Sequence, residues 1–205
     1  MEEKKLIVTA KAISRIFNPF AIPFLGFLVL FVFSYLRIMP LQYKLIVLVV
    51  VYCFTILMPM LTIFLFQKIN GWGIKELSDR EKRFVPYLLT ILAYVFCLLI
   101  MYKLSLPRYM SGIILATLAA MVICILINLK WKVSAHMTGM GGVVGGLVSF
   151  SFLFNYNPVW WLCLFLLISG ALGTSRIIVK QHTLGQVIIG FLVGLVCAIY
   201  GILYS

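Results

Sequence analysis

The two histidines of the chain each stand in a short polar break between long apolar runs. His182 follows Arg176 by six positions and precedes Gln186 by four, and His136 follows Ser134 by two. A neutral imidazole can attack a phosphoryl group, and a guanidinium can bind two phosphate oxygens at once. We therefore predict that the two breaks meet on one membrane face and form one phosphate-handling site.

His182 is expected just outside the N-terminus of a helix. The segment from Thr183 to Gln186 fits a capping box, in which a Ser or Thr and a Gln or Glu three positions later satisfy each other's backbone N–H groups. The first turn of a helix offers N–H groups and partial positive charge to an anion. The alternative for a single histidine in such a loop is an interfacial residue that faces water and lipid headgroups. A second histidine in a matching position favours the site.

The second break predicts a similar arrangement at another helix start. If Ser134 caps that helix, His136 lies in its first turn and Lys132 lies beside it. One histidine can then act as the nucleophile and the other as the general acid for the leaving oxygen. Because both histidines are expected at helix starts on one membrane face, they can serve the same phosphate.

A third polar break, residues 75–86, carries the densest run of basic residues. If this break is helical, Arg80 and Arg83 are neighbours at a spacing of three positions. Taken alone, the run is typical of a solvated charged segment, in which Asp79 and Glu81 pair with the basic residues. The two arginines join the predicted site because the break is expected on the same membrane face as both histidines.

The composition predicts an integral membrane protein. The 205 residues are 64% hydrophobic, with a mean hydropathy of +1.15, whereas a soluble domain is about half apolar. We expect one domain, 1–205, without a cleaved leader. Lys and Arg that flank spans and face anionic headgroups explain the net charge of +12 better than nucleic-acid binding does. The five cysteines are isolated in apolar runs, and no cluster of ligands predicts a metal or another cofactor.

Seven apolar runs approach the length of about 20 residues that a transmembrane helix needs. They predict an all-α transmembrane bundle of six to seven spans, in which Pro59 kinks the second span. In the fifth span, the pairs Gly141/Gly145 and Gly142/Gly146 favour close helix packing over a glycine-rich phosphate cradle. The seven runs cover residues 17–36, 43–66, 86–103, 109–129, 136–154, 158–174 and 184–204.

Successive spans place the polar breaks alternately on two faces, and seven spans place the termini on opposite faces. The N-terminus and the three functional breaks share one face, which carries 13 of the 17 Lys and Arg residues. Setting aside four possible site residues still leaves nine on this face against four on the other. Positively charged loops favour the cytoplasmic side. The charges therefore favour a site that faces the cytoplasm, in a bacterial cytoplasmic membrane.

Three segments carry a family resemblance. Residues 175–186 read Ser-Arg-x5-His-x3-Gln, which is similar in every spacing to the motif Ser-Arg-x5-His-x3-Asp of the type 2 phosphatidic acid phosphatases. Residues 133–136 read Val-Ser-Ala-His, which resembles their motif Pro-Ser-Gly-His, and residues 80–86 loosely resemble their motif Lys-x6-Arg-Pro. The chain resembles this family, which shares a helical core with vanadium haloperoxidases, over about residues 75–190.

The resemblance implies a phosphohistidine at His182 and a general acid and base at His136. Gln186 replaces the aspartate that orients the nucleophile in the family. Its oxygen can still accept a hydrogen bond from the ring, but it adds no negative charge. Members of the family mostly place this site on the outer face of the membrane, opposite to the side that the charges favour here. The residues implied to hold the phosphate are Arg176, Arg83 and Ser134, with Arg80 and Lys132 as helpers.

These features predict an integral membrane phosphatase that removes phosphate from a lipid. Phosphatidic acid, phosphatidylglycerol phosphate, an isoprenyl mono- or diphosphate and lipid A all fit. Two alternatives stay open: a lipid-phosphate binding or transport protein without catalysis, and a lipid phosphotransferase that uses the same phosphohistidine. The five acidic residues, at positions 2, 3, 76, 79 and 81, lie outside the predicted spans, which argues against a proton-coupled carrier.

Overall fold

The computed structural model describes residues 2–33, 35–71 and 84–204, and every regular element in these ranges is helical. Seven helical segments of this part of the chain are long and apolar enough to cross a membrane, which confirms the all-α transmembrane bundle. The elements are α1 (Glu2–Ile16), η1 (Pro19–Ala21), α2 (Ile22–Phe33), η2 (Tyr35–Ile38), α3 (Leu41–Tyr52), η3 (Cys53–Leu57), α4 (Met58–Asn70), α5 (Phe84–Lys103), α6 (Arg108–Asn128), α7 (Ala135–Phe154), α8 (Val159–Ile178) and α9 (Leu184–Leu203).

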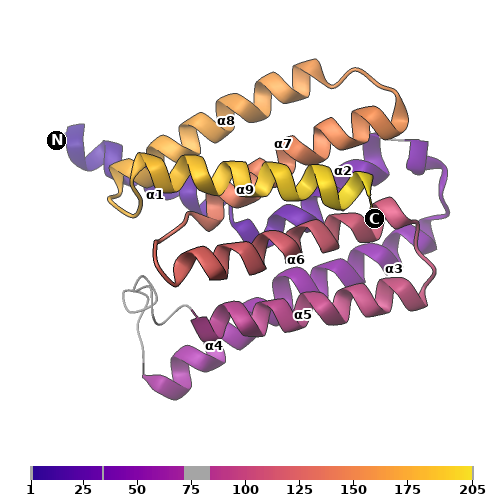
Figure 1. Cartoon of the computed structure of the whole chain (residues 1–205), viewed down its shortest axis with the longest axis horizontal. Coiled ribbons are helices and arrows are strands. Elements are labelled where there is room, and N and C mark those ends of the chain that lie inside the picture. The colour runs from indigo at the N-terminus through magenta and orange to yellow at the C-terminus, as the bar shows by residue number, and fades with distance from the viewer. Residues whose placement is uncertain (1, 34, 72–83, 205) are drawn as a thin grey trace.

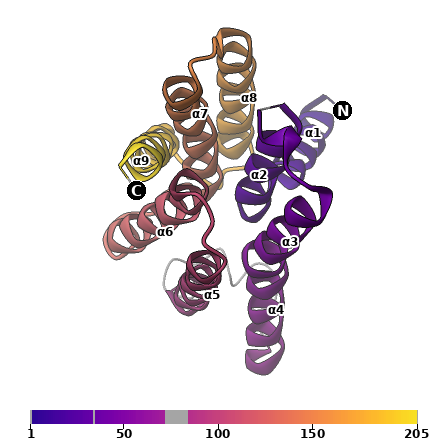
Figure 2. The same cartoon turned by 90° about the vertical axis from the view of Figure 1, so that its right-hand side faces the viewer.

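The helices lie side by side along one long axis, and the two ends of the chain lie at opposite ends of the bundle (Figure 1). Seen along that axis, α7 lies among α9, α8, α6 and α2 (Figure 2). It contacts all four of these helices and also the short turn η1. The fifth span is therefore the central helix, and its first turn contains both buried and partly buried side chains.

The first span begins earlier than the apolar run 17–36 predicts. A continuous candidate span covers Lys5–Val32, and it consists of α1, the 3₁₀ turn η1 and α2. At the break, the side chain of Asn18 accepts a hydrogen bond from the backbone N–H of Phe20 at 3.2 Å, and Pro19 has no N–H to continue the helix. The prediction missed α1 because this helix is amphipathic, so its sequence contains no uninterrupted apolar run.

The second span, in which Pro59 was predicted to cause a kink, contains a π turn directly before the helix that carries this proline. It runs from α3 through η3 to α4, and η3 is one turn of π-helix, Cys53–Leu57. The N–H of Met58 donates to the carbonyl of Cys53, five residues earlier. A proline donates no hydrogen bond, and its ring displaces the carbonyl four residues before it. The wider π turn accommodates both effects without ending the span.

Glycines allow α7 and α9 to pack at very close range. A Cβ on Gly145 would stand 2.5 Å from the carbonyl oxygen of Leu195, and a Cβ on Gly141 would overlap the carbonyl oxygen of Phe191. These two glycines confirm the prediction of close packing. The second predicted pair differs, because a Cβ on Gly142 would meet nothing within 4 Å and one on Gly146 would be 3.7 Å from Ile202. Only the pair Gly141/Gly145 therefore requires glycine to leave room for α9.

A small apolar core lies beside the first turns of α7 and α9. Its buried members are Met137, Met140, Leu172 and Val187. Several partly buried side chains pack against it, among them Ile13, Phe17, Phe165, Ile168 and Phe191. Because these residues come from α1, α7, α8 and α9, the core fixes the relative positions of those four helices. Met137 directly follows His136, and Val187 directly follows Gln186. This core therefore supports the candidate site.

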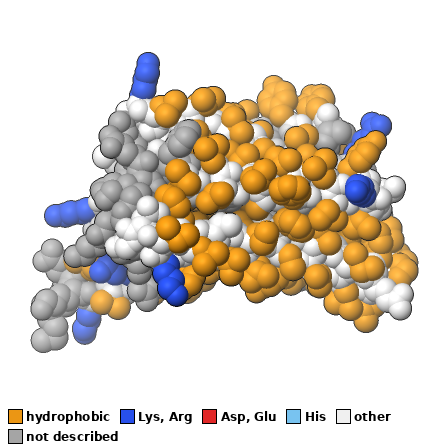
Figure 3. All heavy atoms as spheres, turned by 90° about the horizontal axis from the view of Figure 1, so that it is seen from below, with side chains coloured by type: hydrophobic (Ala, Val, Ile, Leu, Met, Phe, Trp, Pro, Cys, Tyr) orange, Lys and Arg blue, Asp and Glu red, His pale blue; other side chains and the backbone are white. Residues whose placement is uncertain are grey.

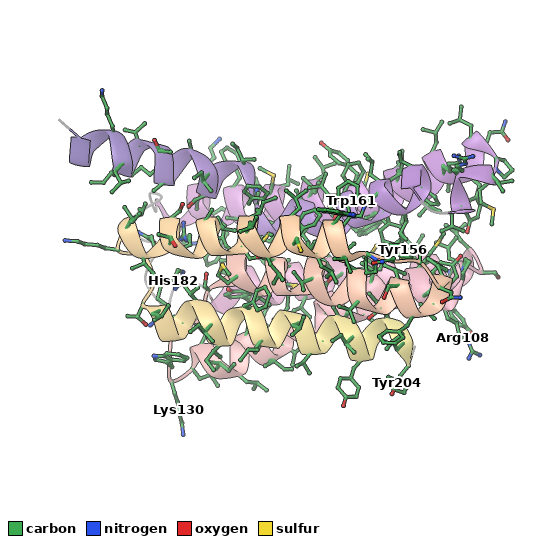
Figure 4. All side chains as sticks on the ribbon, turned by 90° about the horizontal axis from the view of Figure 1, so that it is seen from above. Arg108, Lys130, Tyr156, Trp161, His182 and Tyr204 are labelled. Atoms are coloured by element: carbon green, nitrogen blue, oxygen red, sulfur yellow. The ribbon has the colours of Figure 1, made fainter. Side chains whose placement is uncertain are left out.

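The polar breaks lie at two ends of an apolar body. His182 and Lys130 lie at one end of the bundle, and Arg108, Tyr156 and Tyr204 lie at the other (Figure 4). On the face drawn in Figure 3, hydrophobic side chains cover the middle, and Lys and Arg gather at the two ends. The predicted alternation of the breaks is confirmed for the loops before α7 and before α9, which share one end.

Candidate active site

The loop between α8 and α9 turns the chain back on itself, so that His182 meets Arg176. Lys180 adopts a left-handed conformation with φ of 54°. Its N–H donates to the carbonyl of Ile177 at 2.8 Å, and the N–H of Gln181 donates to the carbonyl of Arg176 at 3.1 Å. This pair of bonds is a Schellman motif, which ends a helix and reverses the chain. The N–H of His182 also donates to the carbonyl of Arg176, at 3.4 Å.

Gln186 orients the ring of His182 and caps α9 with the same atom. Its Oε1 accepts a hydrogen bond from the backbone N–H of Thr183 at 3.2 Å, as part of the predicted capping box. The same oxygen lies 3.2 Å from Nδ1 of His182. A backbone N–H only donates, so the side-chain atom that it meets is the amide oxygen. That oxygen only accepts, so the proton of the neutral His182 ring is on Nδ1.

The tautomer of His182 has a direct chemical consequence. With the proton on Nδ1, the lone pair of the neutral ring is on Nε2, which is then the nitrogen able to attack an electrophile. The ring is 7% exposed, so its orientation is fixed by packing as well as by Gln186. The sequence left open whether Gln186 caps the helix or orients His182. The structure combines the two roles in one oxygen.

Ser134 occupies the N-cap position of α7 as predicted, but its side chain makes no capping bond. Its backbone N–H donates to the carbonyl of Gln186 at 3.3 Å, which joins the starts of α7 and α9. Its hydroxyl is fully buried and has no hydrogen-bond partner among the described residues. A buried polar group left unsatisfied costs about 1–3 kcal/mol. A ligand oxygen next to this hydroxyl would remove that cost.

His136 lies in the first turn of α7, as predicted, and its ring contacts α1. Nε2 of His136 lies 3.2 Å from the carbonyl oxygen of Ser14. A carbonyl only accepts, so Nε2 carries a proton and the lone pair of the neutral ring is on Nδ1. Ser14 was not among the predicted site residues. A usable signal in the sequence was the pair of small residues Ala10 and Ser14, which stand four positions apart and so share one face of α1. The structure buries both.

The structure describes two of the four remaining predicted phosphate ligands, Arg176 and Lys132. Arg176 lies in the last turn of α8 and is half-buried. Lys132 is half-buried in the loop before α7, and this loop packs on α9, where the indole of Trp131 lies 3.4 Å from the position of a Cβ on Gly185. Arg80 and Arg83 lie outside the described residues, so their predicted role stays a prediction.

The arrangement can bind and attack an anion at one end of the bundle. His182 is joined to Gln186 through its ring and to Arg176 through its backbone, and Ser134 is joined to Gln186 through its backbone. These bonds bring His182, Arg176 and Ser134 together on neighbouring turns of the chain. Among the described residues, no three His, Cys, Asp or Glu side chains lie together in a way that could hold a metal ion.

No family model, no curated protein and no solved structure matches this chain. The family resemblance therefore depends on the motif residues alone.

Proposed function

We propose that the protein is an integral membrane phosphatase that hydrolyses a lipid phosphate through a phosphohistidine on Nε2 of His182. The observation that carries this proposal is the contact between Nδ1 of His182 and Oε1 of Gln186 at 3.2 Å. Gln186 fixes the proton on Nδ1, which leaves the lone pair of the neutral ring on Nε2.

The phosphate-binding part of the proposal is supported by groups of different kinds. Arg176 can bind two phosphate oxygens. The buried hydroxyl of Ser134 lacks a hydrogen-bond partner in the described part of the chain, and the α7 N-terminus beside it attracts negative charge. Lys132 adds a second positive charge near the same helix start. Arg83 and Arg80 lie outside the described residues and stay predicted members of the set.

The proposed reaction has two displacement steps at phosphorus. First, Nε2 of His182 attacks phosphorus, the bond from phosphorus to the lipid oxygen breaks, and protonated His136 donates a proton to that oxygen. A lipid alcohol leaves, or a lipid monophosphate if the substrate is a diphosphate. Neutral His136 then accepts a proton from a water molecule, whose oxygen attacks the phosphohistidine. The bond from phosphorus to nitrogen breaks and inorganic phosphate leaves.

An open groove near the same end supports a lipid rather than a soluble substrate. The groove has a volume of about 280 Å³ and lies between η1 and α4. The break that forms η1 also packs against α7, where Pro19 and Ile22 contact Gly139, three residues after His136. Inside a bilayer a hydrocarbon chain is the natural occupant of an apolar groove. We propose that it is the chain of the substrate. The lining residues are Asn18, Phe20, Met60, Ile63, Phe64 and Gln67.

Filling the groove tests this assignment. Ile63→Trp should raise KM for a long-chain lipid phosphate about tenfold and leave KM for a short-chain analogue unchanged. Leu61→Trp is the matched control, because Leu61 lies two residues away on α4, is exposed and does not line the groove. Equal effects of both variants on both substrates would remove the groove from the proposal.

The function itself is tested by phosphate release from a panel of lipid phosphates. Purified wild-type protein should release inorganic phosphate from at least one member of the panel, and His182→Ala should release it only at the background rate. A radiolabelled lipid phosphate should transfer acid-labile label to the wild-type protein. Binding of the same lipids without release or labelling would instead identify a lipid-phosphate binding protein. Transfer of label to an added alcohol in place of water would identify a phosphotransferase.

We further propose that the site faces the cytoplasm in a bacterial cytoplasmic membrane. The excess of Lys and Arg on the site end supports this orientation. A reporter that is active only in the cytoplasm, fused after Ser205, should then be silent. A strong signal from this fusion would show that the site faces outward.

A further inference from the structure

The N-terminal helix α1 reaches the first turn of α7, which carries His136. Helix α1 packs along α8, and its residue Ile13 packs, together with Phe17 directly after the helix, against the small core beside the site. Ser14 lies between them and is 8% exposed. His182 therefore has a ring partner close in the sequence, Gln186, whereas His136 has one on a helix more than 100 positions away.

The carbonyl that meets His136 belongs to the last turn of α1. The last four carbonyls of a helix have no partner inside the helix. In α1 the carbonyl of Ile13 accepts the N–H of Phe17 at 3.2 Å, and the chain then leaves the helix at the η1 break. The next carbonyl, that of Ser14, meets Nε2 of His136 at 3.2 Å. The contact thus satisfies a carbonyl that the end of the helix leaves without a backbone donor.

We propose that α1 is part of the active site, and that the main-chain carbonyl of Ser14 is a positioning group that holds His136 with a proton on Nε2. His136 then exchanges protons with the substrate through Nδ1. The exchange with the substrate rests on the proposed function, whereas the tautomer does not. The carbonyl end of a helix carries partial negative charge and stabilises a protonated histidine. The end of α1 therefore supplies what a carboxylate partner would supply to a general acid.

The two rings are consequently held in opposite tautomers. His182 carries its proton on Nδ1 because it faces the oxygen of Gln186, and His136 carries its proton on Nε2 because it faces the carbonyl of Ser14. The nucleophile presents Nε2, and the proton donor presents Nδ1. A histidine pair held in one common tautomer would contradict this arrangement.

The chain offers a direct measurement, because it contains two histidines. Protein labelled with ¹⁵N in the imidazole rings should give, at a pH where both rings are neutral, one ring of each tautomer. His136→Gln assigns the signals, and its amide N–H can still donate to the carbonyl of Ser14. A wild-type spectrum with the proton of His136 on Nδ1 would overturn the proposal, whether or not the protein is a phosphatase.

Two variants of α1 test the role of the helix. Ile13→Asn should loosen the contact of α1 with the small core, so that His136 becomes a mixture of tautomers and kcat falls about tenfold or more at unchanged KM. Ile16→Asn is the matched control, because Ile16 is 71% exposed, and it should leave the spectrum and kcat as in wild type. Ser14→Ala keeps the main-chain carbonyl and should also leave the tautomer of His136 unchanged.

The spectrum contains its own control for folding. The signal of His182 depends on the α8–α9 loop and should keep its Nδ1 proton in every α1 variant. A tautomer change at His136 in Ile13→Asn, with His182 unchanged, supports the proposal even if no lipid phosphate is hydrolysed. An unchanged His136 signal in Ile13→Asn, with α1 shown to be detached by proteolysis, would overturn it.

Discussion

The two histidines are held by different kinds of structure. His182 is fixed within eleven residues, by the Schellman motif at Arg176 and by the capping box of Gln186. His136 is fixed by Ser14, which is 122 positions away in the sequence. The arrangement around His182 forms together with the start of α9, because its hydrogen bonds join near neighbours in the sequence. The distant arrangement exists only when α1 is docked. The position of His182 therefore depends mainly on local hydrogen bonds, and that of His136 depends on the packing of α1.

The largest expected effect separates the chemical roles of the two rings. His182→Ala should remove both turnover and label transfer from a radiolabelled lipid phosphate. His136→Ala should slow turnover by about 10²- to 10⁴-fold, the usual contribution of a general acid or base, and the phosphorylated protein should accumulate. Labelled protein separated on a gel, alongside phosphate release, measures both quantities. Identical turnover and labelling in the two variants would contradict different chemical roles for His182 and His136.

The second effect tests the close contact between α7 and α9. His136 lies in the first turn of α7, and His182 lies just before α9. Gly141→Ala would force a methyl group against the carbonyl of Phe191, and overpacking of this kind typically costs about 1–3 kcal/mol or more. Gly142→Ala is the matched control, because its methyl group would enter open space. Thermal unfolding in detergent should show a clear loss of stability for Gly141→Ala and almost none for Gly142→Ala. Similar unfolding temperatures would contradict the close contact.

A third prediction concerns the buried hydroxyl between the two arrangements. Ser134→Ala should lower kcat/KM by about 10- to 100-fold, which corresponds to the loss of one hydrogen bond to a charged group. The same change should leave stability equal or slightly higher, since it removes a buried hydroxyl without a described partner. Ser149→Ala is the control, because this buried serine of α7 donates to the carbonyl of Gly145 at 2.9 Å. Ser149→Ala should lower stability slightly and spare activity.

The smallest expected effect sharpens the role of Gln186. Gln186→Asp supplies negative charge near Nδ1 of His182 and should give equal or somewhat higher turnover. The cap on α9 should change little, because acidic residues are tolerated in the first turn of a helix. Turnover and unfolding temperature, measured on the same variant, test the orienting role and the capping role of Gln186. A collapse of activity at unchanged stability would contradict both the orienting role and the capping role.

The sequence by itself determined the features that depend on local chemistry. The seven apolar runs located seven spans because a helix that crosses a bilayer must be long and apolar. The segment 183–186 predicted the start of α9, because a capping box joins residues three positions apart. Ser134 stands at the predicted N-cap position of α7, although its side chain makes no capping bond, and Pro59 directly follows the π turn of the second span.

The tertiary structure decided every feature that depends on contact between distant segments. It placed Ser14 against His136, left the hydroxyl of Ser134 buried without a cap bond, and selected Gly141 and Gly145 over their neighbours as the glycines that α9 requires. Sequence spacing gives the direction of a side chain on its own helix, but not the helix that it meets. That choice is made by the packing of α1, α7, α8 and α9 around one small apolar core.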